Sequence, residues 1–493
     1  MTFSQSLTSL LAIGLATACD PGGDSSPVGA AGGSTASSGA NQSGTIGGTS
    51  STQQKSSTGG SSSTQTKPST GGTTATTPGP AVSATLSISG ANRKPVSPRF
   101  FGQNYWSWVP SWGDAVASVE TQTQELKLKF LRAGGANNDK QEPTPFTLAE
   151  VDDFVSFARN VGAEPLLQVP LIKGIAGAAA TAQDAADLVT YVNVTKSYGI
   201  KYFAIGNEPD LYEEQSLRDA GYDAVAFCTE YRAFATAMRA VDPGIKLVGP
   251  DLSWKYVAEN DWLTPFLENC GDVVDVVAVH RYPLQPTVCT QAKAYSDVVA
   301  YRRVLTRVRK VMESTGQAEK PLAFTEANIT WDGDPAKSTM EASPGTFSAA
   351  LWLADNLGAS LEGQLDNVSY WSLSEGWTLG FFDGTKPRPA FHVLKLFSTQ
   401  FGSEVLTVTG ASTDLSVYSG YDADAARTSL FLINKTSSPL ELSVSFVELP
   451  RTEALSLVVA PHSLQLAIVP DDGSTPTVTN YASDMASPTV ATP

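Results

Sequence analysis

Two glutamates stand where apolar, β-prone segments end, and their placement indicates acid–base chemistry. Tyr202–Gly206 is followed by Asn207 and Glu208, and Pro321–Thr325 is followed by Glu326. A buried strand that ends on such residues presents a carboxyl group at its tip. Cleavage of a glycosidic bond needs two carboxyl groups, one as acid and one as nucleophile or base. The sequence therefore predicts a carbohydrate-cleaving enzyme.

Other polar and aromatic residues end the remaining predicted strands. They include an arginine, several amides and several rings, which are the groups that bind sugars. Rings stack on sugar faces, while amides and carboxylates form hydrogen bonds with the hydroxyls. The residues are Asn104 or Tyr105, Arg132, Gln168, Asp251, His280, Tyr282, Asn328 and Trp371.

β-like and helix-like segments alternate from Phe100 to Trp371 and predict an α/β fold, the closed (β/α)8 TIM barrel. Periodicity alone also allows an open doubly wound sheet, but no glycine-rich phosphate fingerprint follows the first strand. In a barrel the strand-end residues share one mouth. The predicted strands are Phe100–Asn104, Lys129–Ala133, Pro165–Val169, Tyr202–Gly206, Lys246–Gly249, Val273–Val279, Pro321–Thr325 and Asn367–Trp371. Predicted helices include Leu148–Val161, Ala182–Ser197, Tyr222–Val241, Ala292–Glu313 and Thr346–Gly358.

After the last barrel strand, short apolar and β-branched segments are separated by Gly, Pro, Asp and Asn turns. This texture predicts a C-terminal antiparallel β-sandwich. We place the catalytic barrel at residues 82–395, the sandwich at 396–470 and a flexible tail at 471–493. Val82–Ser89 is also strand-like, so an alternative is that residues 82–98 join the sandwich and not the barrel.

The N-terminal region predicts export. The apolar stretch Leu10–Leu15 is followed by small residues and Cys19, which reads as a secretory signal. Cys19 resembles the acylated cysteine of a bacterial lipobox, although residues 1–7 lack Lys and Arg. Residues 1–19 are thus the predicted lipoprotein signal peptide, and residues 20–81, rich in Ser, Thr and Gly, a disordered linker. We expect a membrane-anchored lipoprotein at the cell surface or in the periplasm, and otherwise a secreted protein.

Charge and metal-binding residue types exclude several partners. The net charge of −16 argues against nucleic acid or an anionic membrane surface, so the lipid anchor is the predicted membrane contact. The three histidines form no HxH or HExxH motif, and no CxxC occurs, so we expect no metal and no cofactor. Three cysteines follow Cys19, so at least one thiol of an exported protein stays free. Cys270 and Cys289 bracket a predicted strand and could pair, but the sequence leaves this pairing open.

Taken together, these motifs resemble the retaining glycoside hydrolases of clan A. Asn207-Glu208-Pro209 after the fourth strand, with Glu326 after the seventh, carries the resemblance. The β-xylosidase and arabinofuranosidase branches share the barrel-plus-sandwich plan, and Tyr370–Leu373 reads more like the xylosidase or glucanase branches. The heparanase and β-glucuronidase branch looks most similar at Gly206–Tyr212, Val279–Pro283, Phe324–Asn328 and Ala349–Asp355.

The resemblance implies a role for each matching residue. Glu208 would be the general acid/base and Glu326 the nucleophile, with Arg132 keeping Glu326 ionised. Tyr282 would donate to the nucleophile, and Asn207 would bond the sugar 2-hydroxyl. Trp371 would form the apolar platform under the sugar, with Trp377 as an alternative. His280, Asn328 and Asn104 complete the implied substrate-binding set, and Gln168 and Asp251 are not assigned a catalytic role.

One alternative comes from a different functional class. The chain could be a non-catalytic, cell-surface glycan-binding lipoprotein on a barrel scaffold. The presence of both Glu208 and Glu326 argues against it, because an inactive barrel commonly loses one of them. Under either interpretation the partner is an oligosaccharide or polysaccharide.

Overall fold

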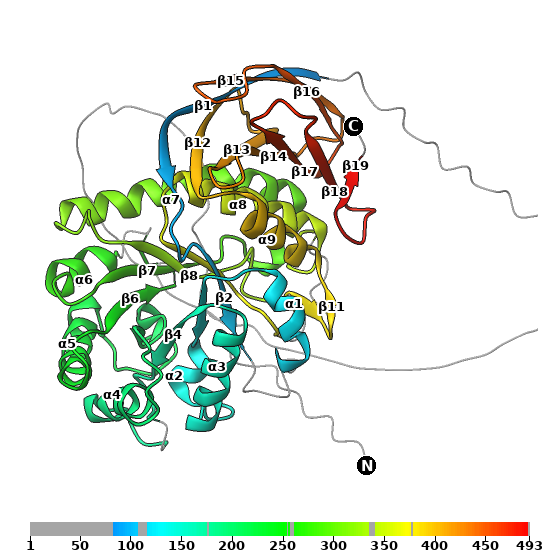
Figure 1. Cartoon of the computed structure of the whole chain (residues 1–493). Helices are drawn as coiled ribbons and strands as arrows, with labels where there is room; N and C mark the ends of the chain where they lie inside the picture. The colour runs from blue at the N-terminus through cyan, green and yellow to red at the C-terminus, as the bar shows by residue number, and fades with distance from the viewer. Residues whose placement is uncertain are drawn as a thin grey trace, which may run out of the picture. The chain divides into compact units, whose positions relative to one another are not determined.

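The computed structural model describes residues 82–106, 116–174, 177–253, 255–256, 261–334, 341–375 and 378–491 (Figure 1). The predicted signal peptide with Cys19, the predicted linker and Trp377 lie outside these described residues. Within the described ranges, we find no helix with the length and hydrophobicity that a membrane span requires.

Eight parallel strands close into the barrel that the sequence predicts. Each strand pairs in parallel with the next along the chain, and β2 pairs with β9 to complete the ring. This closure excludes the open doubly wound sheet. The strands are β2 (Phe101–Tyr105), β3 (Phe130–Ala133), β4 (Glu164–Val169), β5 (Tyr202–Ile205), β6 (Lys246–Leu252), β7 (Val276–Arg281), β8 (Leu322–Ala327) and β9 (Asn367–Tyr370).

Helices with local capping signals cover the outside of the barrel. Thr147 and Glu150 form a capping box at the start of α3, and the Asp223 side chain accepts two backbone N–H bonds at the start of α5. The helices are α1 (Glu120–Glu125), α2 (Ala136–Lys140), α3 (Leu148–Asn160), α4 (Ala182–Val189), α5 (Ala224–Val241), α6 (Leu263–Cys270), α7 (Gln291–Ser314), α8 (Phe347–Glu362) and α9 (Pro389–Gln400).

The barrel interior is apolar at one end and polar at the other. Strand alternation points Phe130 and Arg132 of β3 inward, while Leu131 faces the surrounding helices. Phe130 belongs to the apolar end, and Arg132, two residues later, lies at the mouth. The apolar end is formed by Phe130, Leu166, Ala204, Val248, Val276, Ala278 and Ala323. Side chains thus fill the apolar end of the barrel. At the other end, the inward-pointing residues at the strand tips are polar and line the mouth.

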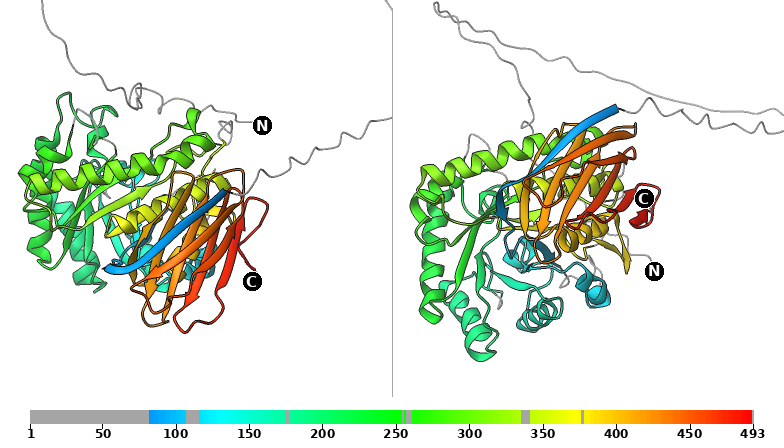
Figure 2. Two further views of the ribbon diagram at one scale, coloured as in Figure 1. Left: turned by 90° about the horizontal axis from the view of Figure 1, so that it is seen from above. Right: turned by 45° about the horizontal axis from the view of Figure 1, so that its top comes forward.

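The C-terminal strands form one nine-stranded sheet that includes the first described strand (Figure 2). β1 (Val82–Pro95) lies between β15 and β12, parallel to β15, and all other neighbours are antiparallel. Residues 82–95 thus lie in the sheet, the alternative position that the sequence allowed. The order is β16 (Leu455–Val459), β15 (Leu440–Val447), β1, β12 (Glu404–Thr409), β13 (Leu415–Asp422), β14 (Arg427–Asn434), β17 (Ser463–Pro470), β18 (Thr477–Ala482) and β19 (Thr489–Ala491).

The sheet and the barrel are joined through α8. One sheet face has its own apolar cluster, which includes Leu86, Leu430 and Val444. The other face packs on α8, and a buried ion pair joins Lys435 to Asp355 of α8 at 2.9 Å. α8 is buried along almost its whole length because it lies between the barrel and the sheet.

Two predictions about the C-terminal half are wrong. The predicted flexible tail contains β18 and β19, because the edge of β17 offers unpaired backbone groups that β18 satisfies. The buried ring of Tyr481 in β18 packs against Phe347 at 4.9 Å between ring centroids. The barrel boundary also lies beyond residue 395, since α9 continues to Gln400.

The structure also answers whether Cys270 pairs with Cys289, which the sequence left open: it does not. Cys270 of α6 is bonded to Cys228 of α5, with their Cα atoms 5.8 Å apart. Neighbouring helices bring these two residues within bonding range, which the spacing along the chain does not reveal. Cys289 is a buried free thiol that donates to the carbonyl of Ala342 at 3.1 Å.

Candidate active site

Glu208 is presented by a turn with unusual backbone geometry. Gly206 and Glu208 have φ angles of +74° and +50°, in the left-handed region that glutamate rarely adopts. A Cβ atom at Gly206 would lie 2.7 Å from the Tyr212 hydroxyl, so this position requires glycine. The N–H of Glu208 donates to the carbonyl of Asp251 at 3.0 Å. This bond fixes the carboxyl end of β5 against β6 and turns Glu208 into the mouth.

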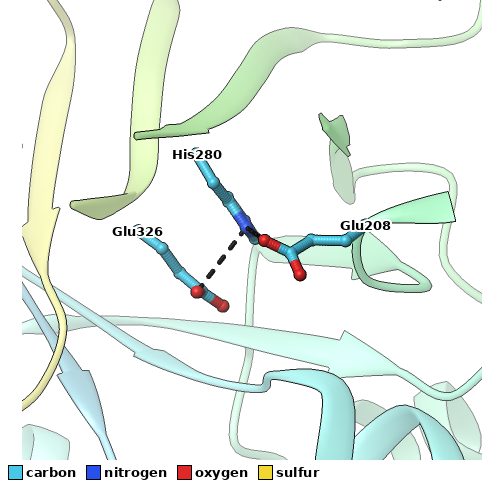
Figure 3. A group of neighbouring side chains, drawn as sticks. All are labelled: Glu208, His280 and Glu326. Carbon is cyan, nitrogen blue, oxygen red and sulfur yellow. Dashed lines mark hydrogen bonds and ion pairs between the residues drawn. The ribbon is translucent and has the colours of Figure 1, made fainter. Parts of the chain in front are cut away.

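Glu208 and Glu326 face each other across the mouth with His280 beside both (Figure 3). His280 Nδ1 lies 3.0 Å from Glu208 Oε1 and 3.6 Å from Glu326 Oε2. One oxygen of each carboxyl group and a ring nitrogen of His280 all lie within 4.8 Å of one another. The side chain of Glu208 is 17% exposed and that of Glu326 6%. A ligand in the mouth can therefore approach both carboxyl groups, and Glu208 is the more accessible one.

Glu326 is held from two sides. Arg132 Nη1 donates to Oε1 at 2.8 Å, and the Tyr282 hydroxyl donates to Oε2 at 2.7 Å. The pairing of β8 with β9 is irregular between Phe324 and Ala327, which allows Glu326 to point into the mouth. Glu326 is thus an oriented carboxylate with a cation on one oxygen and a hydroxyl donor on the other.

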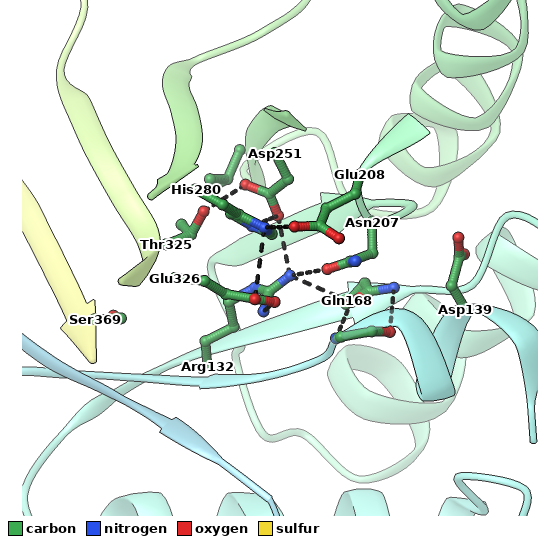
Figure 4. A network of polar contacts seen from close by, with 12 residues as sticks. Arg132, Asp139, Gln168, Asn207, Glu208, Asp251, His280, Thr325, Glu326 and Ser369 are labelled. Atoms are coloured by element: carbon green, nitrogen blue, oxygen red, sulfur yellow. Dashed lines mark hydrogen bonds and ion pairs between the residues drawn. The ribbon is translucent and has the colours of Figure 1, made fainter. Parts of the chain in front are cut away.

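The guanidinium of Arg132 links the tips of five strands below the carboxyl pair (Figure 4). Arg132 is fully buried. Besides Glu326, it donates to Asn207 Oδ1 at 2.8 Å, to Asn104 Oδ1 at 3.1 Å and to Asp251 Oδ2 at 3.2 Å. A longer bond of 3.4 Å reaches Gln168. Because the guanidinium fork has a fixed geometry, it sets the spacing of these strand tips.

Burial and neighbouring charges give the carboxyl groups different protonation. Burial raises the pKa of Glu208; His280 opposes this, and the charge of Glu326 adds to it. Burial also acts to raise the pKa of Asp251, but the charge of Arg132 and the contacts with His280 outweigh it and lower that pKa to about 2. Burial lowers the pKa of His280, yet Glu326, Asp251 and Glu208 together raise it to about 10. At neutral pH the site therefore contains an imidazolium and an ionised Asp251, and the pKa of Glu208 is shifted in the direction that favours its protonated form.

The charges of the buried site balance when Glu208 carries its proton. Arg132 and His280 contribute two positive charges, and Asp251 and Glu326 contribute two negative charges. An ionised Glu208 would add an uncompensated negative charge to a site with little access to water. The composition of the site thus favours one acid and one carboxylate.

A second buried network supports the Asn207–Glu208 segment. The N–H of Asn207 donates to the hydroxyl of Tyr212 at 3.2 Å, and that hydroxyl donates to Asp139. Asp139 also accepts the N–H of Leu171 at 2.6 Å. Burial raises the pKa of Asp139 to about 6, although the bond from Tyr212 opposes the shift. No sequence pattern marked Asp139, because it follows Asn137 and Asn138 in a polar stretch after β3.

Two asparagines in the predicted binding set direct their side chains into the protein. Asn104 accepts from Arg132 and donates to the carbonyl of Thr325 at 2.9 Å. Asn328 donates to the carbonyl of Trp371 at 2.5 Å and accepts from the Tyr370 hydroxyl at 3.0 Å. Both amides are fully buried, so they position neighbouring residues and do not line the mouth.

Trp371 lies at the mouth beside the catalytic strands. Its backbone N–H donates to the carbonyl of Ala327, next to Glu326, at 2.9 Å. A Cβ atom at Gly135 would lie 2.7 Å from the ring, so the ring extends over the tip of β3. Its indole N–H donates to Glu375, which the sequence did not single out. Glu375 follows Trp371 by four positions, and that proximity was the available signal.

Asp251 and Gln168, which the sequence left unassigned, both contact Arg132. Asp251 also accepts the hydroxyl of Thr325 at 2.6 Å. Gln168 accepts the N–H of Gly135 at 2.5 Å. A strand-end position alone does not separate such supporting residues from those that meet a substrate.

Glu208, His280 and Glu326 are also spaced so that they could ligate a cation. The oxygens of Glu326 are already bonded to Arg132 and Tyr282, and His280 is an imidazolium at neutral pH. A divalent cation would have to displace a proton from His280 and lie near the guanidinium of Arg132. The charges of the site therefore fit a proton-transfer centre better than a metal centre.

Comparisons with known proteins agree with this geometry. Residues 187–406 match the family described as Glycosyl hydrolases family 39, from α4 to β12. This segment of the chain is similar to clan A glycoside hydrolases. The predicted resemblance to this clan is thereby confirmed.

Two curated proteins to which the chain is similar are heparanases. Heparanase of Mus musculus is 24% identical over 294 residues, which are 58% of this chain and 52% of that protein. Heparanase of Bos taurus is 24% identical over 238 residues, which are 46% and 41% of the two chains. The matched segment thus spans about half the length of these relatives.

Solved structures share the fold of this chain. A bifunctional glucanase-xylanase from a metagenome library has a TM-score of 0.61 at 14% identity, covering 79% of this chain and 99% of its own. An α-L-arabinofuranosidase from Thermotoga petrophila has a TM-score of 0.60 at 15% identity, covering 78% and 100%. A Paenibacillus polymyxa xyloglucanase has a TM-score of 0.60 at 13% identity, covering 79% and 99%.

Proposed function

We propose that the chain is a retaining glycoside hydrolase that cleaves a β-linked glycan with Glu208 as acid/base and Glu326 as nucleophile. The observation that carries the proposal is the separation of the two carboxyl groups, whose nearer oxygens lie within 4.8 Å. Retaining enzymes place their carboxyl groups about 5–5.5 Å apart, whereas inverting enzymes need about 6.5–9.5 Å to admit a water.

In the first step Glu326 attacks the anomeric carbon while Glu208 gives its proton to the leaving oxygen. The bond from Tyr282 and the ion pair with Arg132 aim the Glu326 carboxylate. The raised pKa of Glu208, caused mainly by burial, keeps a proton available for the leaving group. The products are the released glycan and a glycosyl ester on Glu326.

In the second step Glu208 acts as a base. It removes a proton from a water that attacks the anomeric carbon, and the ester bond to Glu326 breaks. While Glu326 is esterified it carries no charge, and Glu208 carries one. The net charge of Glu208, Glu326, Asp251, Arg132 and His280 together is therefore the same before and after the ester forms. Neither stage leaves a buried charge uncompensated.

The positively charged His280 assists the exchange of roles. Its Nδ1–H lies near an oxygen of each catalytic glutamate. It stabilises whichever carboxylate is ionised, without itself losing a proton at neutral pH, because its pKa is about 10. Asn207, held by Arg132 through Oδ1, keeps its Nδ2 donors for a sugar hydroxyl.

Two classes of donor sugar are candidates. The name of the curated relatives supports a β-glucuronidase- or heparanase-like activity. The names of the structural relatives support neutral sugars such as xylose, glucose and arabinose. The alternative interpretation, a non-catalytic glycan-binding protein, has no observation in its favour.

The stereochemistry of the first product tests the reaction type. Aryl glycosides and polysaccharides are incubated with the purified protein, and the product anomer is followed by proton NMR before mutarotation. We expect the anomer of the substrate to appear first, and the opposite anomer would contradict retention.

A variant of the acid/base separates the two steps. Glu208→Ala is expected to lower kcat by about 10²–10⁴-fold on substrates with poor leaving groups. Azide should restore activity on an activated aryl glycoside and yield a glycosyl azide of retained configuration. Glu125→Ala, whose exposed carboxylate pairs with Lys395 of α9, serves as the control and should keep wild-type kcat.

We also propose that the protein is exported and anchored through an acylated Cys19. Growth with a labelled fatty acid should label the wild-type protein, and Cys19→Ser should abolish the label and release the protein from membranes. Labelling of the Cys19→Ser protein would contradict the anchor.

A further inference from the structure

Glu375 places another carboxyl group beside the predicted sugar platform. One oxygen, Oε2, accepts the indole N–H of Trp371 and the hydroxyl of Ser372, the latter at 3.4 Å. Among the described residues, the other oxygen has no hydrogen-bond partner. Trp371 itself lies next to Glu326 through its backbone bond to Ala327. Glu375 thus holds the platform with one oxygen and has the other available for a ligand.

The surroundings of Glu375 disfavour additional negative charge. Burial raises the pKa of Glu375 to about 8, and the charge of Glu326 adds to the shift. The bonds from Trp371 and Ser372 oppose it without reversing it. Within the described part of the chain, no lysine or arginine offsets this shift. Among the described residues, the positive charges that pair with carboxylates of the mouth, on Arg132 and His280, are already matched by Asp251 and Glu326.

We propose that Glu375 is a specificity-determining residue that binds a hydroxyl of the donor sugar and that the site accepts a neutral sugar in preference to a uronate. This inference rests on the proposed glycosidase function and extends it to the substrate class. The protonated carboxyl group both donates and accepts, as a sugar hydroxyl requires.

A uronate would meet the opposite conditions. It differs from the corresponding hexose by a carboxylate in place of a hydroxymethyl group. That charge would enter a mouth in which the balance of Arg132, His280, Asp251 and Glu326 is complete and Glu375 already retains a proton. Burying an unpaired charge there is unfavourable, so the uronide should bind and react more slowly than the neutral glycoside.

The test compares neutral and acidic 4-nitrophenyl β-glycosides in the wild type and in three variants. The substrates are the xyloside, glucoside, galactoside and glucuronide, measured as kcat/KM at pH 6. We expect the best neutral substrate to exceed the glucuronide by about 100-fold or more, because a site built for a hydroxyl rejects a mismatched group strongly. A glucuronide that equals or exceeds every neutral substrate would overturn the inference.

The variants separate a specificity role from a structural one. Glu375→Gln keeps an acceptor for Trp371 and a neutral hydrogen-bonding group, so neutral substrates should stay within about tenfold of wild type. Glu375→Ala should lower kcat/KM for neutral substrates by about 100-fold. Glu375→Lys supplies a cation and should narrow the neutral-to-glucuronide ratio by about tenfold or more. An unchanged ratio in Glu375→Lys, with the variant folded, would contradict the role.

Binding without turnover distinguishes this inference from the proposed function. Isofagomine-type inhibitors of xylose, glucose and glucuronic acid configuration are titrated by calorimetry. Preferred binding of a neutral inhibitor supports the inference even if no substrate is cleaved, in which case the hydrolase proposal alone fails. Preferred binding of the glucuronic acid inhibitor, or binding of none, overturns the inference. Retentive cleavage of the glucuronide alone also overturns it and leaves the hydrolase proposal intact.

Discussion

Removing the guanidinium of Arg132 should both destabilise the protein and stop catalysis. Arg132 is fully buried and forms ion pairs with Glu326 at 2.8 Å and Asp251 at 3.2 Å. Arg132→Met leaves Asp251 and Glu326 with His280 as the sole counter-charge of the buried site described above. Breaking a buried pair in this way costs about 3–5 kcal/mol.

The pKa of Asp251 gives an independent magnitude. Against the opposing effect of burial, Arg132 and the contacts with His280 lower this pKa from 3.8 to about 2. At about 1.4 kcal/mol per pKa unit, that shift corresponds to roughly 2–3 kcal/mol of stability. Because the folded pKa is depressed, the contribution is present above about pH 4 and is lost as the pH falls through about 2. The stability gap between wild type and Arg132→Met should therefore shrink below pH 4.

Urea denaturation followed by tryptophan fluorescence at pH 7 measures the effect, and a double variant tests its electrostatic cause. Arg132→Met should lose about 3 kcal/mol. Adding Asp251→Asn restores the charge balance and keeps an acceptor for Thr325, so the double variant should regain about 1 kcal/mol or more but no activity. Lys395→Met, which removes an exposed ion pair with Glu125, should cost less than about 1 kcal/mol. A single-variant loss under about 1 kcal/mol, or a further loss from Asp251→Asn, would refute the reasoning.

Three further predictions follow from individual contacts. Tyr282→Phe removes the donor to Glu326 and should lower kcat by about 10²–10³-fold with a smaller change in KM. The control Tyr370→Phe loses a bond to Asn328 and should lower kcat less. Equal effects of the two variants on kcat would contradict the role of Tyr282. The pKa of His280 is raised to about 10, so its imidazolium stabilises the fold fully below about pH 6.5 and loses this contribution as the pH rises to about 10. In thermal unfolding, the wild type should therefore lose stability between these pH values. The stability of His280→Gln should depend less on pH in this range. Lys435→Met removes the ion-pair partner of Asp355 between α8 and the sheet and should cost about 3 kcal/mol of unfolding free energy in urea, with kcat unchanged. An additional Asp355→Asn should recover part of this loss. A fall in kcat would show that the interface affects the mouth.

The sequence predicted the barrel and the carboxyl pair because both are local patterns. Eight apolar runs separated by amphipathic segments specify the barrel, and the residues that end these runs necessarily meet at its mouth. That rule was sufficient to predict that Glu208 and Glu326 lie at the mouth. Residues that act through a contact with another side chain could not be predicted in this way. Asp139 acts through Tyr212, which lies 73 positions away, and no local pattern marks that contact. Glu375 lies only four positions after Trp371, but this spacing alone does not show that the two side chains bond.

The errors and the open cysteine pairing share the same physical origin. The pairing of Cys228 with Cys270 depends on the packing of α5 against α6, and periodicity does not fix that packing. The strands β18 and β19 lie in a polar segment whose order comes from the free edge of β17. Asn104 and Asn328 end strands as predicted, but whether a strand-end amide points to the ligand or to a neighbouring carbonyl depends on the tertiary structure.

Covalent trapping of the glycosyl-enzyme tests the central claim most directly. The protein is incubated with activated 2-deoxy-2-fluoro glycosides of xylose, glucose and glucuronic acid, then digested and sequenced by mass spectrometry. The account predicts a stable adduct on Glu326 in the wild type and in Glu208→Gln, and none in Glu326→Gln. An adduct on Glu208 or on any other residue would contradict the assignment of Glu326 as the nucleophile.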